Sequence, residues 1–130
     1  MSGELRLLGV KDAEATYPLA YAEDPSTRLD QWRARLSRRP GLGGAYGWFS
    51  RGLPDAVLAY SLARTAEGQG LFVVDTLSAF DLTEPARKAA RLLDAVLETD
   101  VVADRQVVWA ATSSRPALLI PAVAALQSVF

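Results

Sequence analysis

The segment Leu71–Leu97 constrains the fold more than any other part of the sequence. It begins with LFVVDTLSAF, an apolar run rich in β-branched residues that is typical of a strand buried on both faces. A short polar turn, DLTEP, follows, and ARKAARLLDAVL then has the spacing of an amphipathic helix. Backbone N–H groups at the start of such a helix have no partner within it and favour anions. The segment therefore predicts a buried strand, a helix and a candidate binding corner between them.

The amino-acid composition excludes several kinds of catalytic and binding chemistry. The 130 residues are 50% hydrophobic and 22% charged, with a formal net charge of −1. We therefore expect one globular domain over residues 1–130, with neither nucleic acid nor a membrane as partner. Cysteine and histidine are absent, so disulfides, thiolate chemistry and histidine-based triads are excluded and we expect no metal centre. No apolar run reaches the ~18 residues of a membrane span, and we expect a soluble cytoplasmic protein.

The remaining patterns predict an α+β fold (an α/β mixed sheet) with helices on both faces and the order β-α-α-β-β-β-α-β-α. The first expected elements are a strand at Glu4–Val10, a helix at Ala13–Ala22 capped by Asp12 and interrupted by Pro18, and a helix from Ser26 or Thr27 to Arg38. Three strands are expected next, at Ala45–Ser50, Ala56–Arg64 and Leu71–Phe80. The last expected elements are a helix at 83–98, a strand at Val107–Ala111 and a helix from Ser113 or Ser114. Hairpin-length turns make the three middle strands antiparallel, whereas the helix at 83–98 makes the strands on either side of it parallel.

Two residues are candidates for proton transfer. Asp75 stands within the buried strand, where burial raises a carboxylate pKa and fits it to act as a base for an amine. The same residue would equally suit a structural ion pair with an arginine. Tyr60 is a candidate general acid, and packing of its ring in the core is the alternative.

Two groups of basic residues also have two interpretations. Arg87 and Lys88, at the start of the predicted helix, are placed to hold phosphates together with its free N–H groups. The alternative is a well-capped surface helix whose charges are solvated. The second predicted helix carries a cluster of arginines interleaved with Asp30, which indicates a solvated face rather than a nucleic-acid site. The arginines of this cluster are Arg28, Arg33, Arg35, Arg38 and Arg39.

The element order, the sequence VVDTLSAF before a turn and a helix, and the ending AALQSVF resemble the GCN5-related N-acetyltransferase (GNAT) superfamily over essentially the whole chain. The resemblance implies that the fourth and fifth strands diverge to admit acetyl-CoA. Strand-four backbone at Leu77, Ser78 and Ala79 would contact the pantetheine arm, and the next turn, with Arg87, Lys88 and Ala89, would bind the pyrophosphate. The family motif Gln/Arg-x-x-Gly-x-Gly/Ala falls on 84–89, where Ala89 matches and Glu84 and Arg87 differ.

The resemblance implies transfer of an acetyl group from acetyl-CoA to a small-molecule or peptide amine, with Asp75 or a water taking the amine proton. The alternative is a GNAT-fold binding or assembly module without catalysis. It is suggested by the differences at Glu84 and Arg87 and by an ending without the family's tyrosine. Family members continue with two more strands after the last helix, which this sequence lacks. Either the chain is truncated or a partner covers the open edge of the 107–111 strand, and in the second case we expect a homodimer through that edge.

Overall fold

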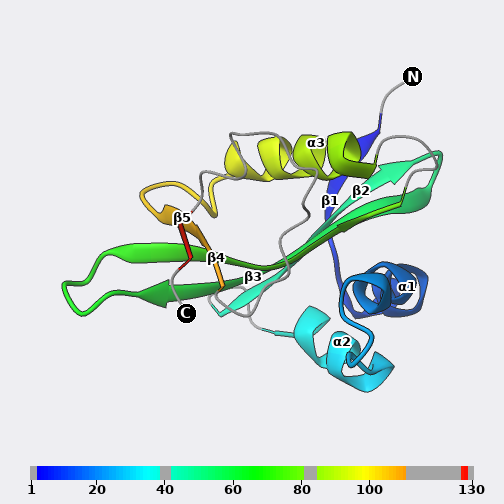
Figure 1. The fold of residues 1–130 in the computed structure, drawn as a ribbon, viewed down its shortest axis with the longest axis horizontal. Helices are drawn as coiled ribbons and strands as arrows, with labels where there is room; N and C mark the ends of the chain where they lie inside the picture. Colours follow the sequence, from blue (N-terminus) through cyan, green and yellow to red (C-terminus); the bar gives the residue numbers. More distant parts are fainter. Residues whose placement is uncertain (1–2, 39–41, 81–84, 111–126, 129–130) are drawn as a thin grey trace.

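The computed structural model describes residues 3–38, 42–80, 85–110 and 127–128 (Figure 1). Its elements are β1 (Glu4–Leu7), the 3-10 turn η1 (Val10–Asp12), α1 (Ala13–Glu23), α2 (Leu29–Leu36), β2 (Gly43–Ser50), β3 (Leu53–Arg64), β4 (Gly70–Ala79), α3 (Pro85–Leu97), β5 (Gln106–Trp109) and β6 (Gln127–Ser128). No helix within these ranges is long and apolar enough to cross a membrane.

A six-stranded mixed sheet with the order β1-β2-β3-β4-β5-β6 forms the centre of the molecule. β1 to β4 are antiparallel neighbours, and β5 and β6 are added in parallel. Figure 1 shows α3 on one face of the sheet and α1 and α2 on the other. The expected α+β fold with helices on both faces is confirmed.

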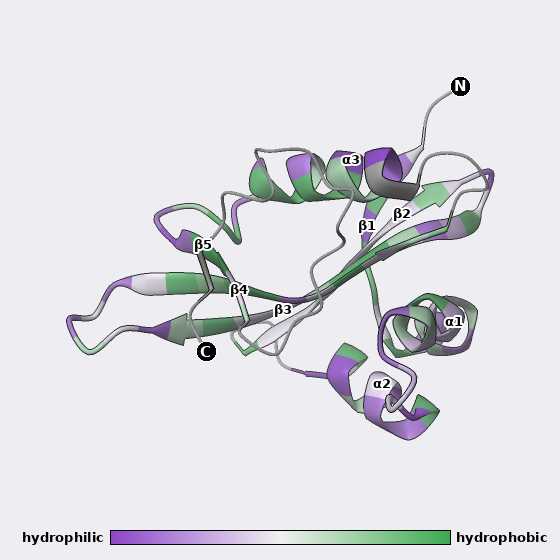
Figure 2. Ribbon diagram, in the orientation of Figure 1, coloured by the Kyte–Doolittle hydropathy of each residue, from purple (hydrophilic) through white to green (hydrophobic). Residues whose placement is uncertain are grey.

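Two hydrophobic clusters, one on each face of the sheet, make up most of the core. The cluster under α3 includes Leu58, Phe72, Val74, Leu77, Leu92, Leu93, Val96 and Trp109. The cluster under α1 and α2 includes Leu8, Leu19, Trp32, Leu36, Phe49 and Val57. In Figure 2 the side of α3 toward the sheet is hydrophobic and its outer side carries hydrophilic residues. Each such buried side chain contributes about 1.5–3 kcal/mol of hydrophobic free energy, which fixes the helices against the sheet.

The helix boundaries differ from the expected ones because of their caps. Asp12 makes no side-chain cap; its carboxylate accepts hydrogen bonds from Gly9 N (2.9 Å) and Arg6 Nη2 (3.3 Å) and so closes the turn before α1. α1 continues through Pro18 to Glu23. α2 begins at Leu29 rather than at Ser26 or Thr27, since Ser26 is bonded to Asp24 instead.

Strand bounds also differ from the expected ones: β1 ends at Leu7 rather than Val10, and β3 begins at Leu53 rather than Ala56. Gly43, which precedes the strand expected from Ala45, belongs to β2, where its φ of 133° and its closeness to the Tyr60 carbonyl leave no room for a Cβ. β5 is not the edge of the sheet, because β6 pairs with it at Val108 and Trp109. Pairing the edge satisfies backbone groups that would otherwise face solvent. The last expected helix, from Ser113 or Ser114, lies outside the described residues.

Candidate functional site

β4 separates from β5 at Asp75. The β4–β5 pairing ends at Val74–Trp109, with one further hydrogen bond from Ala110 N to Val74 O (3.0 Å). On its other side β4 stays paired with β3, but the register shifts so that Asp75 has no partner and forms a bulge. Within the described residues, the β5-facing edge of β4 has no strand partner from Asp75 to Ala79. The bulge therefore marks where backbone groups of β4 become available.

The carboxylate of Asp75 is held through one of its oxygens. Oδ2 accepts hydrogen bonds from Arg35 Nη1 (3.0 Å) and Ser61 Oγ (2.5 Å), and Arg35 Nη1 also donates to Tyr60 O (3.1 Å). No described residue donates to Oδ1. Burial lowers the pKa of Arg35, and the charge of Asp75 opposes that shift. The sequence-based alternative of an ion pair with an arginine is thus confirmed, and it leaves one oxygen available.

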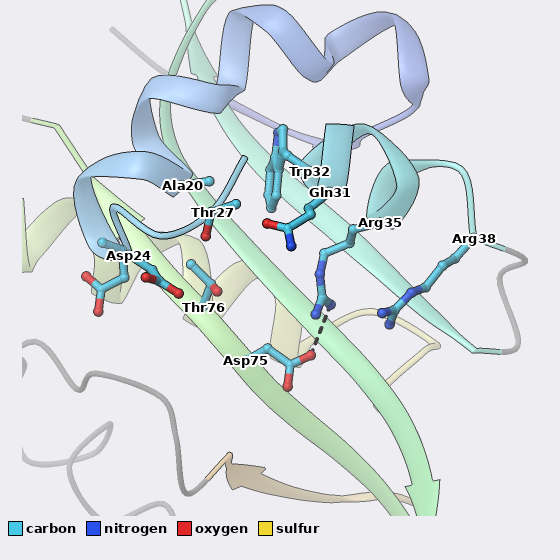
Figure 3. Close-up of a pocket in the computed structure, with 10 residues that line it drawn as sticks. Ala20, Asp24, Thr27, Gln31, Trp32, Arg35, Arg38, Asp75 and Thr76 are labelled. Carbon is cyan, nitrogen blue, oxygen red and sulfur yellow. Dashed lines mark hydrogen bonds and ion pairs between the residues drawn. The ribbon is translucent and has the colours of Figure 1, made fainter. Parts of the chain in front are cut away.

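A cavity of about 570 Å³ opens beside this ion pair, between the C-terminal end of α1, α2 and the bulge of β4 (Figure 3). Its described lining residues are Ala20, Glu23, Asp24, Thr27, Gln31, Trp32, Arg35, Arg38, Asp75 and Thr76. Most of these side chains are polar or charged, and the buried indole of Trp32 is the aromatic part of the wall. Its size is within the range of small-molecule sites.

Hydrogen bonds fix the acidic end of the cavity. Asp24 follows α1 directly, and its Oδ1 accepts hydrogen bonds from Ser26 N (3.0 Å) and Ser26 Oγ (2.6 Å). These bonds lower the pKa of Asp24 below its usual value. Glu23 Oε2 is removed from solvent contact. The cavity thus presents carboxylates at the negative end of the α1 dipole, where a cation is favoured.

Tyr60, the other candidate for proton transfer, lies on the opposite face of the sheet from this cavity. Its ring is stacked between Tyr46, with centroids 5.7 Å apart, and Phe72, with centroids 4.7 Å apart. It is 3% exposed within the cluster under α3, and burial raises its pKa. The structure therefore does not bring the Tyr60 hydroxyl and the Asp75 carboxylate together.

The residues predicted to hold a cofactor lie at the end of β4 and the start of α3. Leu77 and Ser78 are buried, and Ala79 is half-buried. On α3, Arg87 is exposed and Ala89 packs in the core against the sheet. Lys88 Nζ is 2.9 Å from Asp55 Oδ2, so this ammonium links α3 to β3. Glu84 lies outside the described residues.

Arg35 and Ser61 belong to the candidate site, and the sequence did not single them out. Arg35 was interpreted as part of a solvated arginine face, yet its side chain is only 21% exposed. Its position between Trp32 and Leu36, which are buried on α2, is the sequence feature from which its closeness to the sheet could have been predicted. Ser61 carried no comparable signal.

Comparison with known proteins supports the fold. No family model and no curated protein matches the sequence. A ribosomal-protein-alanine N-acetyltransferase from Brucella melitensis biovar Abortus 2308 superposes with a TM-score of 0.66 at 18% identity, covering 83% of this chain and 79% of that one. The aminoglycoside N-acetyltransferase AAC(6')-Iy in complex with CoA superposes with a TM-score of 0.68 at 13% identity, covering 85% of this chain and 77% of that one.

A third structure, of a possible acetyltransferase from Clostridium difficile 630, gives a TM-score of 0.64 at 9% identity. The match covers 100% of this chain and 94% of the other chain, so the likeness is not confined to one part of the fold. At such identities the likeness establishes architecture rather than activity. The chain has the fold of the GCN5-related N-acetyltransferases.

Proposed function

We propose that this protein transfers an acetyl group from acetyl-CoA to an amine that binds in the cavity between α1, α2 and β4. One observation carries the proposal: Asp75, which lines the cavity, is also the residue at which β4 separates from β5. A donor along the edge of β4 and an acceptor in the cavity would meet at this residue. The acetyltransferase structures that share the fold, one of them in complex with CoA, support the same assignment.

The described residues offer matching groups for acetyl-CoA. Acetyl-CoA supplies the acetyl group as a thioester. Backbone groups of β4 at Leu77, Ser78 and Ala79 would hold the pantetheine arm along the edge that carries no strand partner within the described residues. At the start of α3, backbone N–H groups with Arg87 and Lys88 would hold the pyrophosphate, although Asp55 neutralises part of the Lys88 charge. The small side chain of Ala89 lets this helix start approach the sheet closely.

Asp75 has the geometry to orient the amine and accept its proton. Arg35 and Ser61 hold Oδ2, so Oδ1 is the oxygen that an amine N–H would meet. As the N–C bond forms and the thioester C–S bond breaks, one amine proton passes to Asp75 and then to the departing thiolate. The ion pair with Arg35 holds the Asp75 carboxylate in place for this role.

A thiol-release assay tests the proposal. The full chain is incubated with acetyl-CoA and a panel of primary amines, and free CoA is measured over time. We expect amine-dependent release, which Asp75→Asn lowers by about 10²-fold or more while Arg33→Gln, outside the cavity on α2, leaves it unchanged. Absence of amine-dependent release across the panel would contradict the proposal.

A binding or assembly module without catalysis is the second candidate. Asp75 and Lys88 both take part in ion pairs within the fold, as residues kept for structure would. We propose for this case a homodimer that uses the β6 edge of the sheet. Sedimentation velocity would then give a dimer, and a monomer at high concentration would count against it. The cytoplasmic location stays a prediction from the sequence.

A further inference from the structure

Charges of opposite sign are separated within the cavity. Figure 3 shows Asp24 at one end, Arg38 at the other, and the Arg35–Asp75 ion pair between them. Glu23 joins Asp24 at the acidic end, where α1 finishes. A ligand that spans the cavity therefore meets negative charge at the end of α1 and positive charge beyond the end of α2.

Arg38 supplies positive charge that no described residue compensates. Arg35 is neutralised by Asp75, whereas Arg38 makes no ion pair or side-chain hydrogen bond with any described residue. The two guanidinium groups are close enough that Arg38 lowers the pKa of Arg35, after the larger effects of burial and Asp75. Repulsion between them is relieved when an anion binds at Arg38. A carboxylate suits this place because guanidinium groups bind it through two hydrogen bonds.

The acidic end of the cavity favours a cation, for reasons that do not depend on Arg38. Asp24 is ionised, because Ser26 stabilises its charge, and the carbonyl end of α1 adds partial negative charge. Asp24 makes no ion pair with any described residue, so its charge can meet a cationic group of a ligand. The matching ligand carries a cationic group for Asp24, an anionic group for Arg38 and an amine for Asp75.

We propose that the acceptor is a free cationic amino acid, with two amino groups and one carboxylate. The carboxylate binds Arg38, the side-chain ammonium binds at Asp24, and the α-amine, which lies between them, is placed at Asp75 Oδ1 and is the one acetylated. This inference rests on the proposed acetyl transfer and adds the substrate class. Atoms balance as in that reaction: the amine nitrogen gains the acetyl group, and its proton leaves with the CoA thiol.

Matched acceptors test each charge separately. L-Ornithine and L-lysine are compared with putrescine and cadaverine, which lack the carboxylate, and with L-norvaline and L-norleucine, which lack the side-chain amine. We expect kcat/KM for the two amino acids to exceed that of each counterpart by about tenfold, the effect of one charge-assisted contact. Free CoA and the acetylated product are both measured.

Two variants and a control assign the selectivity to named residues. Arg38→Ala should raise KM for L-lysine about tenfold and leave cadaverine unchanged, whereas Arg33→Ala, on the outer side of α2, should change neither. Asp24→Asn keeps an oxygen for Ser26 and should remove the preference for L-lysine over L-norleucine.

Three outcomes would overturn the inference: cadaverine used as well as L-lysine, Arg38→Ala acting equally on both, or no acetylation of any panel member. A separate titration with acetyl-CoA keeps the two proposals distinguishable. Binding of acetyl-CoA without selectivity for these acceptors removes only the substrate class. Absence of acetyl-CoA binding removes both.

Discussion

Arg35 Nη1 lies 3.0 Å from Asp75 Oδ2 and 3.1 Å from Tyr60 O, and so joins α2 to both central strands. About a fifth of each charged side chain is exposed, so the pair is mostly shielded from water. Removing one member leaves the other partly buried without its counter-charge, which is the costly case for an ion pair. The bulge that presents Asp75 to the cavity therefore depends on a residue 40 positions earlier in the chain.

A double-mutant cycle measures this dependence. Arg35→Met and Asp75→Asn should each lower the free energy of unfolding by about 2 kcal/mol, and the double variant by about 1–2 kcal/mol less than their sum. Urea unfolding followed by circular dichroism gives the three values. The same cycle on the exposed pair Arg28–Asp30 is the control, and no measurable coupling is expected there. Equal coupling in both pairs would contradict the structural role given to Arg35.

Ser61 is a positioning residue in this account, because it touches Asp75 and not the acceptor. Its Oγ donates to Asp75 Oδ2 at 2.5 Å, so Ser61→Ala should leave the carboxylate freer to rotate. We expect kcat to fall about tenfold with KM changed less than twofold, and Ser61→Thr to restore part of the rate. A change confined to KM would instead place Ser61 in acceptor binding. Steady-state kinetics at saturating acetyl-CoA separates the two.

Tyr60 gives a pH dependence of stability with a defined sign. Burial raises its pKa above the value of 10.0 in an unfolded chain, so the folded state holds the phenol proton more tightly. The resulting stability is complete below about pH 10 and is lost as the pH rises through the folded pKa. Tyr60→Phe should therefore lose less stability than the wild type as the pH rises above about 10. Tyr21→Phe, at a half-exposed position, should behave as the wild type does.

Turnover of the same Tyr60→Phe variant separates packing from catalysis. The ring lies between Tyr46 and Phe72, away from Asp75, and phenylalanine preserves those contacts. We expect kcat within about twofold of the wild type, since a lost general acid would cost about 10²-fold or more. A loss of that size would reinstate Tyr60 as the general acid suggested by the sequence.

Acetyl-CoA binding should depend on charge at the start of α3 and not further along it. Arg87→Glu is expected to raise the dissociation constant about tenfold or more, because it reverses the charge beside the N–H groups at the start of the helix. Arg91→Glu makes the same change one turn later at another exposed position and should have little effect. The difference should shrink as salt is raised. Equal losses in the two variants would point to general electrostatic attraction instead.

The fold was predictable to the extent that it follows local periodicity. The strand expected at Leu71–Phe80 is β4 at Gly70–Ala79, and the helix expected at 83–98 is α3 at Pro85–Leu97. Caps were less predictable, because polar side chains such as Asp12 and Ser26 choose among several nearby backbone partners. The pairing of β6 with β5 was not predicted, because a strand of two residues is too short to show a hydrophobic alternation in the sequence.

The candidate site was predictable only in part. A carboxylate within an apolar strand identified Asp75, because burial of such a group requires a partner. Its partner Arg35 was not identifiable, since the contact spans 40 positions and depends on the register shift between β3 and β4. The cavity combines residues from α1, α2 and β4, so no local spacing indicated it.

Calorimetric titration of the full chain with acetyl-CoA tests the central claim most directly. The account predicts saturable binding at one site with a dissociation constant on the order of micromolar, the range usual for enzyme substrates. Absence of binding at millimolar acetyl-CoA would contradict it, and would leave the protein as a GNAT-fold module without catalysis.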